Sequence, residues 1–323
     1  MTAQVTGDAP ATTFSELFNT IAANIEIVIQ GKPEVVELAL VCLLAEGHLL
    51  IEDVPGVGKT SLAKALAASI DSTWKRVQFT PDLLPSDVVG VTVWNRGRDV
   101  FEFRPGPVFA NIVLGDEINR ASPKTQSALL EAMEERQVTV DGVTYPLARP
   151  FMVMATQNPI EHEGTYPLPE SQLDRFLMRL SVGYPSRQSE LEILDTHGSG
   201  GTMSEVHPVA TSAQIQELVN SVKAVHVAPA LKHYLVDVAD ATRRHPNVAL
   251  GMSPRATLAL QRAARARAAA AGRTYAIPDD IKALADPVLS HRIVLSSDAQ
   301  LQGIGASKVV ADVLSAVPVP TGR

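Results

Sequence analysis

The sequence is poor in cysteine, in aromatic residues and in long apolar runs. Its one cysteine, Cys42, can form no disulfide within the chain, and its place in the apolar run 38–45 predicts a buried thiol in a reducing compartment. That run is far shorter than the roughly 20 apolar residues of a membrane span. Residues 1–13 show no basic start and no apolar stretch of a leader. We therefore expect a cytoplasmic protein that does not enter a membrane.

Positive charge is not in excess either. The 28 Lys and Arg residues face 35 Asp and Glu residues, which gives a net charge of −7. This balance argues against a protein whose main task is to coat nucleic acid. At roughly 100–200 residues per domain, a chain of 323 residues is long enough for two domains. Its hydrophobic content of 46% is enough to give each domain an apolar core.

Hydrophobic periodicity predicts an α/β architecture in the first part of the chain. Apolar residues have helical spacing over 14–45, and a glycine-rich turn followed by a helix comes directly after the first strand. Strand, glycine loop and helix follow one another in the order that a parallel sheet requires. The short apolar strands are predicted at 48–51, 75–79, 112–114 and 151–155.

Two β-hairpins interrupt this pattern, and the strand signals stop near Ser186. One hairpin is predicted over 91–103, and the other over 138–145 around an Asp-Gly turn. A glycine-rich segment then predicts a linker, and only helices are expected after it, at 212–221, 229–244, 253–271 and 279–289. The predicted domains are an α/β domain over 1–195, a linker over 196–204 and an all-α domain over 205–323.

A phosphate-binding loop is predicted between the first strand and its helix. Backbone N–H groups of a glycine loop and of a helix N-terminus can point at phosphate oxygens. Lys59 would reach the β- and γ-phosphates, and the Thr60 hydroxyl would bind Mg²⁺. The motif has Asp53 where a glycine is usual, and we expect this carboxylate to turn away from the nucleotide. The residues predicted to bind nucleotide are Pro55, Gly56, Val57, Gly58, Lys59, Thr60 and Ser61.

Two adjacent carboxylates, Asp116 and Glu117, follow the apolar strand 112–114. Ligands of open α/β sheets bind in the crevice outside the carboxyl ends of the strands. We predict that Asp116 holds Mg²⁺ through water and that Glu117 polarises the water that attacks ATP. Alone, two carboxylates at a strand end are more often solvated side chains, and it is their combination with the glycine loop that indicates a nucleotide site.

Three further polar residues complete the predicted set. Asn158 follows the strand 151–155 and could orient the water or touch the γ-phosphate. Arg175 follows a short predicted helix, and Arg255 lies in the first turn of a helix with Ser253 as its N-cap and Pro254 at its first position. Phosphoryl transfer needs positive charge on the γ-phosphoryl oxygens. Both arginines are therefore candidates for that role, although either alone would be interpreted as a surface ion pair.

In this order the motifs resemble those of the AAA+ ATPases. Their amino-acid sequences are similar to those of the MoxR family, which belongs to the helix-2-insert clade. The resembling segments are 50–60, 106–109, 116–133, 155–159 and 168–176. The resemblance implies a three-layer αβα P-loop domain with a five-stranded parallel sheet, followed by a small all-α lid domain, with the two hairpins as inserts.

The same resemblance implies a function. Such proteins bind ATP and Mg²⁺ at the subunit interfaces of a ring, usually a hexamer, and act as chaperones that mature or activate client proteins. They commonly work with a partner that carries a von Willebrand A domain. The resembled fold places Arg175 at the domain edge, where it would act on the ATP of the neighbouring subunit, whereas Arg255 could act in cis or in trans.

Two alternatives remain open. A nucleic-acid motor would use basic hairpin tips, and the first hairpin offers Arg96 and Arg98, which Asp99 offsets. A nucleotide-gated scaffold would bind ATP with little turnover. Trp94 and Phe101 near the tip either face a client or pack on the sheet beneath. The identity of the client and of the partner cannot be read from the sequence.

Overall fold

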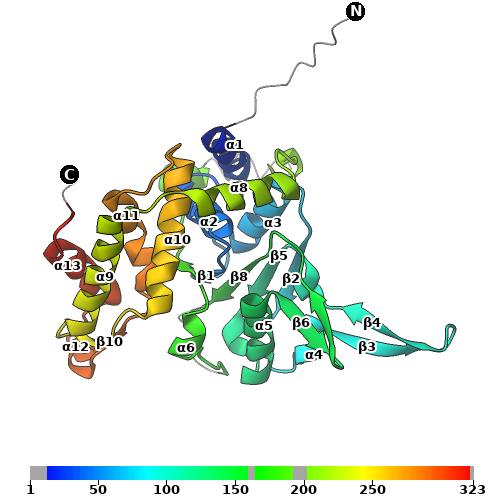
Figure 1. Ribbon diagram of the computed structural model, residues 1–323. Helices are drawn as coiled ribbons and strands as arrows, with labels where there is room; N and C mark the ends of the chain where they lie inside the picture. Colours follow the sequence, from blue (N-terminus) through cyan, green and yellow to red (C-terminus); the bar gives the residue numbers. More distant parts are fainter. Residues whose placement is uncertain (1–12, 159–163, 192–201, 321–323) are drawn as a thin grey trace, which may run out of the picture.

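The computed structural model describes residues 13–158, 164–191 and 202–320. They form an α/β domain and a helical domain, from whose common body one long hairpin projects (Figure 1). Most of the predicted linker, 196–204, lies outside the described residues, and its last part belongs to the 3₁₀-helix Thr202–Glu205. The exact domain boundaries therefore stay predictions.

A five-stranded parallel sheet forms the centre of the α/β domain. The strand order is β2-β5-β8-β1-β9, which brings the carboxyl ends of β5, β8 and β1 next to one another. These three strands are buried along almost their whole length, as expected where helices cover both faces of a sheet. The predicted fold is thus confirmed. The strands are β1 (Leu49–Glu52), β2 (Trp74–Gln78), β5 (Ile112–Asp116), β8 (Met152–Gln157) and β9 (Met178–Leu180).

Successive residues of the central strands enter two different apolar cores. In β1, Leu49 and Ile51 belong to the core on one face of the sheet, whereas Leu50 belongs to the core on the other face. The first core contains residues of three helices of this domain together with residues of the lid, and the second core contains residues of α5. This arrangement makes the three layers. The helices are α1 (Phe14–Glu26), α2 (Pro33–Leu44) and α3 (Lys59–Ser69) on the first face and α5 (Pro123–Glu135) on the second.

Strand β9 was not predicted from periodicity. It has three residues, too few to show an alternating pattern. The backbone N–H of Leu177, just before it, donates to the carbonyl oxygen of His48 at 2.8 Å, and β9 then pairs with β1. The contact with β1, and not the local sequence, decides that this segment is a strand.

Both predicted hairpins are present. The first consists of β3 (Gly90–Asn95) and β4 (Val100–Pro105), and it follows α4 (Pro85–Val89). The second consists of β6 (Gln137–Val140) and β7 (Val143–Pro146), and its turn has positive φ angles at Asp141 and Gly142, as a two-residue hairpin turn requires.

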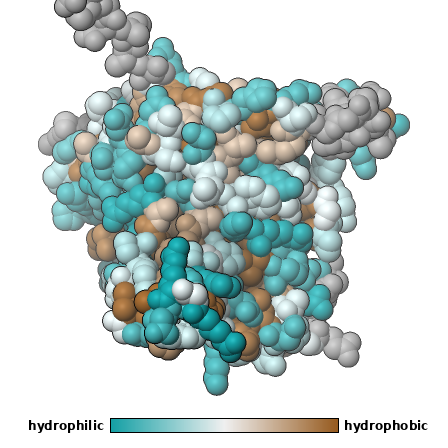
Figure 2. Space-filling view, turned by 90° about the vertical axis from the view of Figure 1, so that its right-hand side faces the viewer, coloured by the Kyte–Doolittle hydropathy of each residue, from teal (hydrophilic) through white to brown (hydrophobic). Residues whose placement is uncertain are grey.

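The first hairpin exposes aromatic side chains. Trp94 and Phe101 face each other across the two strands with ring centroids 4.9 Å apart, and they are 46% and 72% exposed. Figure 2 looks onto this side of the molecule and shows a hydrophilic hairpin tip with apolar surface beside it. At the base, Phe103 stacks on Tyr145 of the second hairpin, with centroids 4.1 Å apart. The base is therefore anchored, whereas the aromatic pair near the tip is not part of the core.

The second domain is a helical lid. Its α10 shares one apolar core with α1 and α2 of the first domain, so the lid is packed against the N-terminal helices. No helix in the described part of the chain is both long and apolar enough to cross a membrane. The lid helices are α8 (Ser212–Ala224), α9 (Pro229–Arg244), α10 (Pro254–Ala270), α11 (Pro278–Leu289), α12 (Ser297–Leu301) and α13 (Ala306–Ala316).

In one detail the prediction of a lid made only of helices is wrong. Strands β10 (Val248–Leu250) and β11 (Val294–Leu295) form a small antiparallel pair. Strands of three and two residues carry no recognisable period, and these two are far apart in the sequence. Their pairing depends on the packing of the helices between them.

Two buried histidines, His48 and His291, are neutral in the folded protein. The N–H of Val153 donates to Nδ1 of His48 at 3.0 Å, and Nε2 of His48 lies 3.1 Å from the carbonyl oxygen of Met133. Burial lowers the pKa of His48 to about 4 and that of His291 to about 3. An unfolded histidine has a pKa of about 6.5, so the unfolded chain takes up protons first as the pH falls.

We therefore expect the free energy of unfolding to be lower at pH 5 than at pH 7, by about 2 kcal/mol for each of these histidines. Each contribution is fully present above about pH 6.5 and is lost as the pH falls toward the lowered pKa. Urea unfolding at a series of pH values measures the effect. His48→Gln should flatten the pH dependence, and His233→Gln, at an exposed position of α9, should not. Equal slopes in the two variants would contradict this expectation.

Candidate functional site

A cavity of 360 Å³ lies at the carboxyl ends of β1, β5 and β8. The loop between β1 and α3 forms one wall, and Gly56 and Gly58 adopt φ angles of 87° and 94° there, which residues with a Cβ rarely adopt. Six of the seven residues predicted to bind nucleotide line the cavity, and Val57 does not. The lining residues are Pro55, Gly56, Gly58, Lys59, Thr60, Ser61, Arg76, Asp116, Glu117 and Asn158.

Lys59 and Thr60 are the first residues of α3, so the N-terminus of this helix faces the cavity. The Nζ of Lys59 donates to the carbonyl oxygen of Asp53 at 2.9 Å. This bond holds the ammonium group over the loop. Together with the partial positive charge of a helix N-terminus, it makes this wall suited to phosphate.

The Asp53 carboxylate turns away from the cavity, as expected. It accepts hydrogen bonds from the Ser181 hydroxyl at 2.9 Å and from the backbone N–H of Gly183 at 2.6 Å, both beyond the end of β9. A third bond comes from the N–H of Val54. Burial alone would raise the pKa of Asp53, but these hydrogen bonds outweigh it and hold the pKa below its usual value. The ionised Asp53 carboxylate therefore joins the loop to the segment that follows β9.

Asp116 and Glu117 stand at the end of β5, and Thr156 of β8 fixes both. Its hydroxyl donates to Oδ1 of Asp116 at 2.6 Å and accepts from the backbone N–H of Glu117 at 2.9 Å. Glu117 has a φ of 57°, in the left-handed region. That turn of the backbone lets two successive carboxylates line one cavity instead of pointing to opposite faces.

Strand β2 supplies two side chains that the sequence analysis missed. Arg76 binds Oδ2 of Asp116 at 2.6 Å, and the Gln78 amide donates to Oε2 of Glu117 at 2.9 Å. Polar residues at alternate positions of a predicted strand were the available signal. Only the pairing of β2 with β5 shows what they contact. Arg120 also reaches Oε2 of Glu117, at 3.1 Å.

Asn158 lies directly after β8, is buried, and lines the same cavity. The structure thus brings together Lys59, Thr60, Asp116, Glu117 and Asn158, as predicted from the sequence. Arg175 and Arg255 do not line this cavity.

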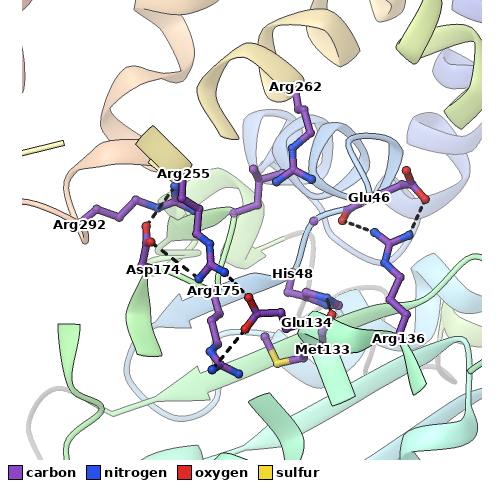
Figure 3. A pocket seen from close by; sticks show the side chains of 12 residues that line it. Glu46, His48, Met133, Glu134, Arg136, Asp174, Arg175, Arg255, Arg262 and Arg292 are labelled. Atoms are coloured by element: carbon purple, nitrogen blue, oxygen red, sulfur yellow. Dashed lines mark hydrogen bonds and ion pairs between the residues drawn. The ribbon is translucent and has the colours of Figure 1, made fainter. Parts of the chain in front are cut away.

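These two arginines lie instead in a second pocket, the arginine pocket, between the α/β domain and the lid (Figure 3). Both bind Glu134 of α5, Arg175 with Oε2 at 3.2 Å and Arg255 with Oε1. Arg175 also donates to the carbonyl oxygen of Leu130. Ser253 caps α10 by accepting from the N–H of Ala256, as predicted. The pocket has a volume of 180 Å³ and is lined by Glu46, Gly47, His48, Met133, Glu134, Arg136, Asp174, Arg175, Leu177, Arg255, Arg262 and Arg292.

Comparison with known proteins agrees with this geometry. The model of the ATPase family associated with various cellular activities (AAA) matches residues 48–178, and that of the AAA lid domain matches residues 240–313. The YeaC protein of Bacillus subtilis is 52% identical over 95% of this chain and 96% of its own length. The chaperone MoxR1 of Mycobacterium tuberculosis is 44% identical over 92% of this chain and 81% of its own length. The chain belongs to the MoxR family of AAA ATPases.

A solved structure has the same fold. A protein of Cytophaga hutchinsonii superposes with a TM-score of 0.89 at 37% identity, and the match covers 95% of this chain and 96% of that one. Membership in the MoxR family confirms the resemblance seen in the sequence. It also implies that the chain binds and hydrolyses ATP.

Proposed function

We propose that this MoxR-family ATPase hydrolyses ATP with Mg²⁺ and works as a ring, expected to be a hexamer, that remodels a client protein in the cytoplasm. The observation that carries the proposal is the separation of Arg175 and Arg255 from the cavity that contains Lys59 and Glu117. Phosphoryl transfer needs positive charge on the γ-phosphoryl group. Arg76 lies in the cavity but binds Asp116. A neighbouring copy in a head-to-tail ring would therefore supply the missing charge.

Within one subunit, different side chains would bind the phosphates and activate the water. Lys59 and the loop amides bind the β- and γ-phosphates, and Glu117 polarises the attacking water, which Asn158 helps to orient. Gln78 and Arg120 both contact Oε2 of Glu117. In the described part of the chain these contacts leave Oε1 to accept a hydrogen bond from the water.

The oxygen donors of the cavity fit Mg²⁺. This cation prefers oxygen ligands and takes few from the protein, because phosphates and water supply the others. The Thr60 hydroxyl and the Asp116 carboxylate line one cavity and would hold it. Both oxygens of Asp116 have protein partners, so this carboxylate would reach the cation through a bound water while Arg76 stays in place. Bound there, Mg²⁺ would neutralise charge on the phosphates.

The first hairpin is the proposed contact with the client. Trp94 and Phe101 form an exposed aromatic pair, and exposed aromatic groups are frequent at protein contacts. A relative that is 44% identical is named a chaperone. A role as a nucleic-acid motor is less well supported, since Arg98 near the tip pairs with Glu102 at 3.1 Å. A partner with a von Willebrand A domain is part of the proposal.

Replacing both exposed rings, in the variant Trp94→Ser/Phe101→Ser, should abolish client capture and leave ATP binding and the melting temperature nearly unchanged. The measurement uses a Glu117→Gln background, so that ATP-bound complexes persist, and identifies proteins that co-purify from the native host by mass spectrometry. Val143→Ser, at an exposed position of the second hairpin, is the matched control. Unchanged capture, or a large loss of stability, would refute the proposed contact.

A further inference from the structure

The arginine pocket contains more positive charge than its carboxylates neutralise. Its lining includes five arginines but only three carboxylates, and these are already engaged. Glu134 binds the two arginines described above. Glu46 binds Arg136 at 2.5 Å and Lys223, outside the pocket, at 2.6 Å.

Arg292 adds a buried charge that its neighbours offset only in part. Its side chain is 3% exposed, and Nη2 donates to the carbonyl oxygen of Phe176 at 2.6 Å. Its Nη1 has no hydrogen-bond partner in the described part of the chain and lies 3.5 Å from Oδ1 of Asp174. Burial, together with the nearby Arg262 and Arg255, lowers the pKa of Arg292 to about 10 against the opposing effect of Asp174.

Arg262 has no carboxylate partner within ion-pair distance among the described residues. Its guanidinium extends into the pocket from α10, the residue is exposed, and no hydrogen bond or ion pair joins it to the other side chains drawn in Figure 3. Arg255 lies two helical turns earlier on the same face of α10. Guanidinium groups gathered in a pocket repel one another unless an anion lies between them.

Contact of Arg175 and Arg255 with the ATP of a neighbouring copy is already part of the proposed function. We propose that Arg262, which has no ion-pair partner among the described residues, is a further donor from the arginine pocket to a phosphate-type oxyanion. Guanidinium groups match the oxygens of phosphate in geometry and charge. The volume of 180 Å³ is below the roughly 300–1,000 Å³ of sites for drug-sized ligands, so it suits phosphate groups and not a whole nucleotide. The source is either a free anion or the terminal phosphate of ATP held by a neighbouring copy, and the second source rests on the proposed ring.

The first experiment titrates pyrophosphate into dilute Lys59→Ala chain by calorimetry, because this variant weakens the phosphate loop. We expect binding that persists in Lys59→Ala and falls by about ten-fold when Arg262→Gln is added. The control adds Arg244→Gln, which removes an arginine of the same lid that is 82% exposed and outside the pocket. That control should bind like Lys59→Ala. Absence of binding, or an equal loss in both double variants, overturns the proposal.

The second experiment identifies the source of the anion. It mixes Lys59→Ala chains with Arg175→Ala chains, so that ATPase activity can arise only where an intact loop meets an intact arginine pocket. Adding Arg262→Gln to the Lys59→Ala partner lowers the recovered activity about ten-fold if the pocket takes the neighbour's phosphate, and leaves it unchanged if the anion is free. If rings do not form, the first experiment still decides whether the pocket binds the anion.

Discussion

Replacing Arg175 by alanine is expected to lower ATP turnover by about 10³-fold or more, the usual effect of losing an arginine that stabilises the γ-phosphoryl group from a neighbouring subunit. Arg175 lies in the arginine pocket, held by Glu134 and by the carbonyl oxygen of Leu130, and not in the cavity of its own subunit. ATP binding should therefore survive the substitution while hydrolysis fails. Steady-state turnover and equilibrium ATP binding measure the two quantities separately.

Mixing two inactive variants tests whether Arg175 acts on the neighbour. In rings of Lys59→Ala and Arg175→Ala chains, some interfaces join an intact phosphate loop to an intact Arg175, so part of the activity should return. Rings mixed from Lys59→Ala and Arg255→Ala chains decide in the same way whether Arg255 acts in cis or in trans. If subunits are shown to exchange and no activity returns, Arg175 serves its own subunit or the fold, and the ring mechanism loses its main support.

Glu117→Gln is expected to retain ATP while turnover falls by about 10²-fold or more, the scale of a lost general base or water-positioning group. The substitution keeps the size of the side chain, and the backbone N–H of Glu117 still donates to Thr156. Lys59→Ala, in contrast, should weaken ATP binding itself, because the ammonium group contacts the phosphates before any reaction.

Fluorescent ATP analogues give the affinity, and phosphate release gives the turnover. Glu217→Gln, at an exposed position of the lid helix α8, is the control for the loss of one carboxylate and should behave as the unmodified chain. Near-normal turnover in Glu117→Gln would remove Glu117 from its predicted role. It would also favour Asp116 or Asn158 as the group that positions the water.

Local sequence determined the elements of the nucleotide cavity. The loop 53–58, the two carboxylates at the end of β5 and Asn158 after β8 each stand at the end of an apolar strand. Parallel strands put their carboxyl ends at one edge of the sheet. Both hairpins were also predictable, because turn residues at 95–99 and 141–142 separate strands of matching length. Glycine loops, strand ends and hairpin turns can be recognised from a few neighbouring residues, so they could be predicted from the sequence.

Tertiary structure alone decided which side chains from distant segments meet. Arg76 and Gln78 reach the carboxylates only because β2 lies beside β5, and Thr156 does so from β8. Asp53 could be expected to turn away, but its partners beyond β9 could not be named, because β9 is too short to carry a period. The arginine pocket combines residues of α5, the turn before β9 and the lid. Its excess of charge results from packing between domains, which periodicity and motif spacing do not encode.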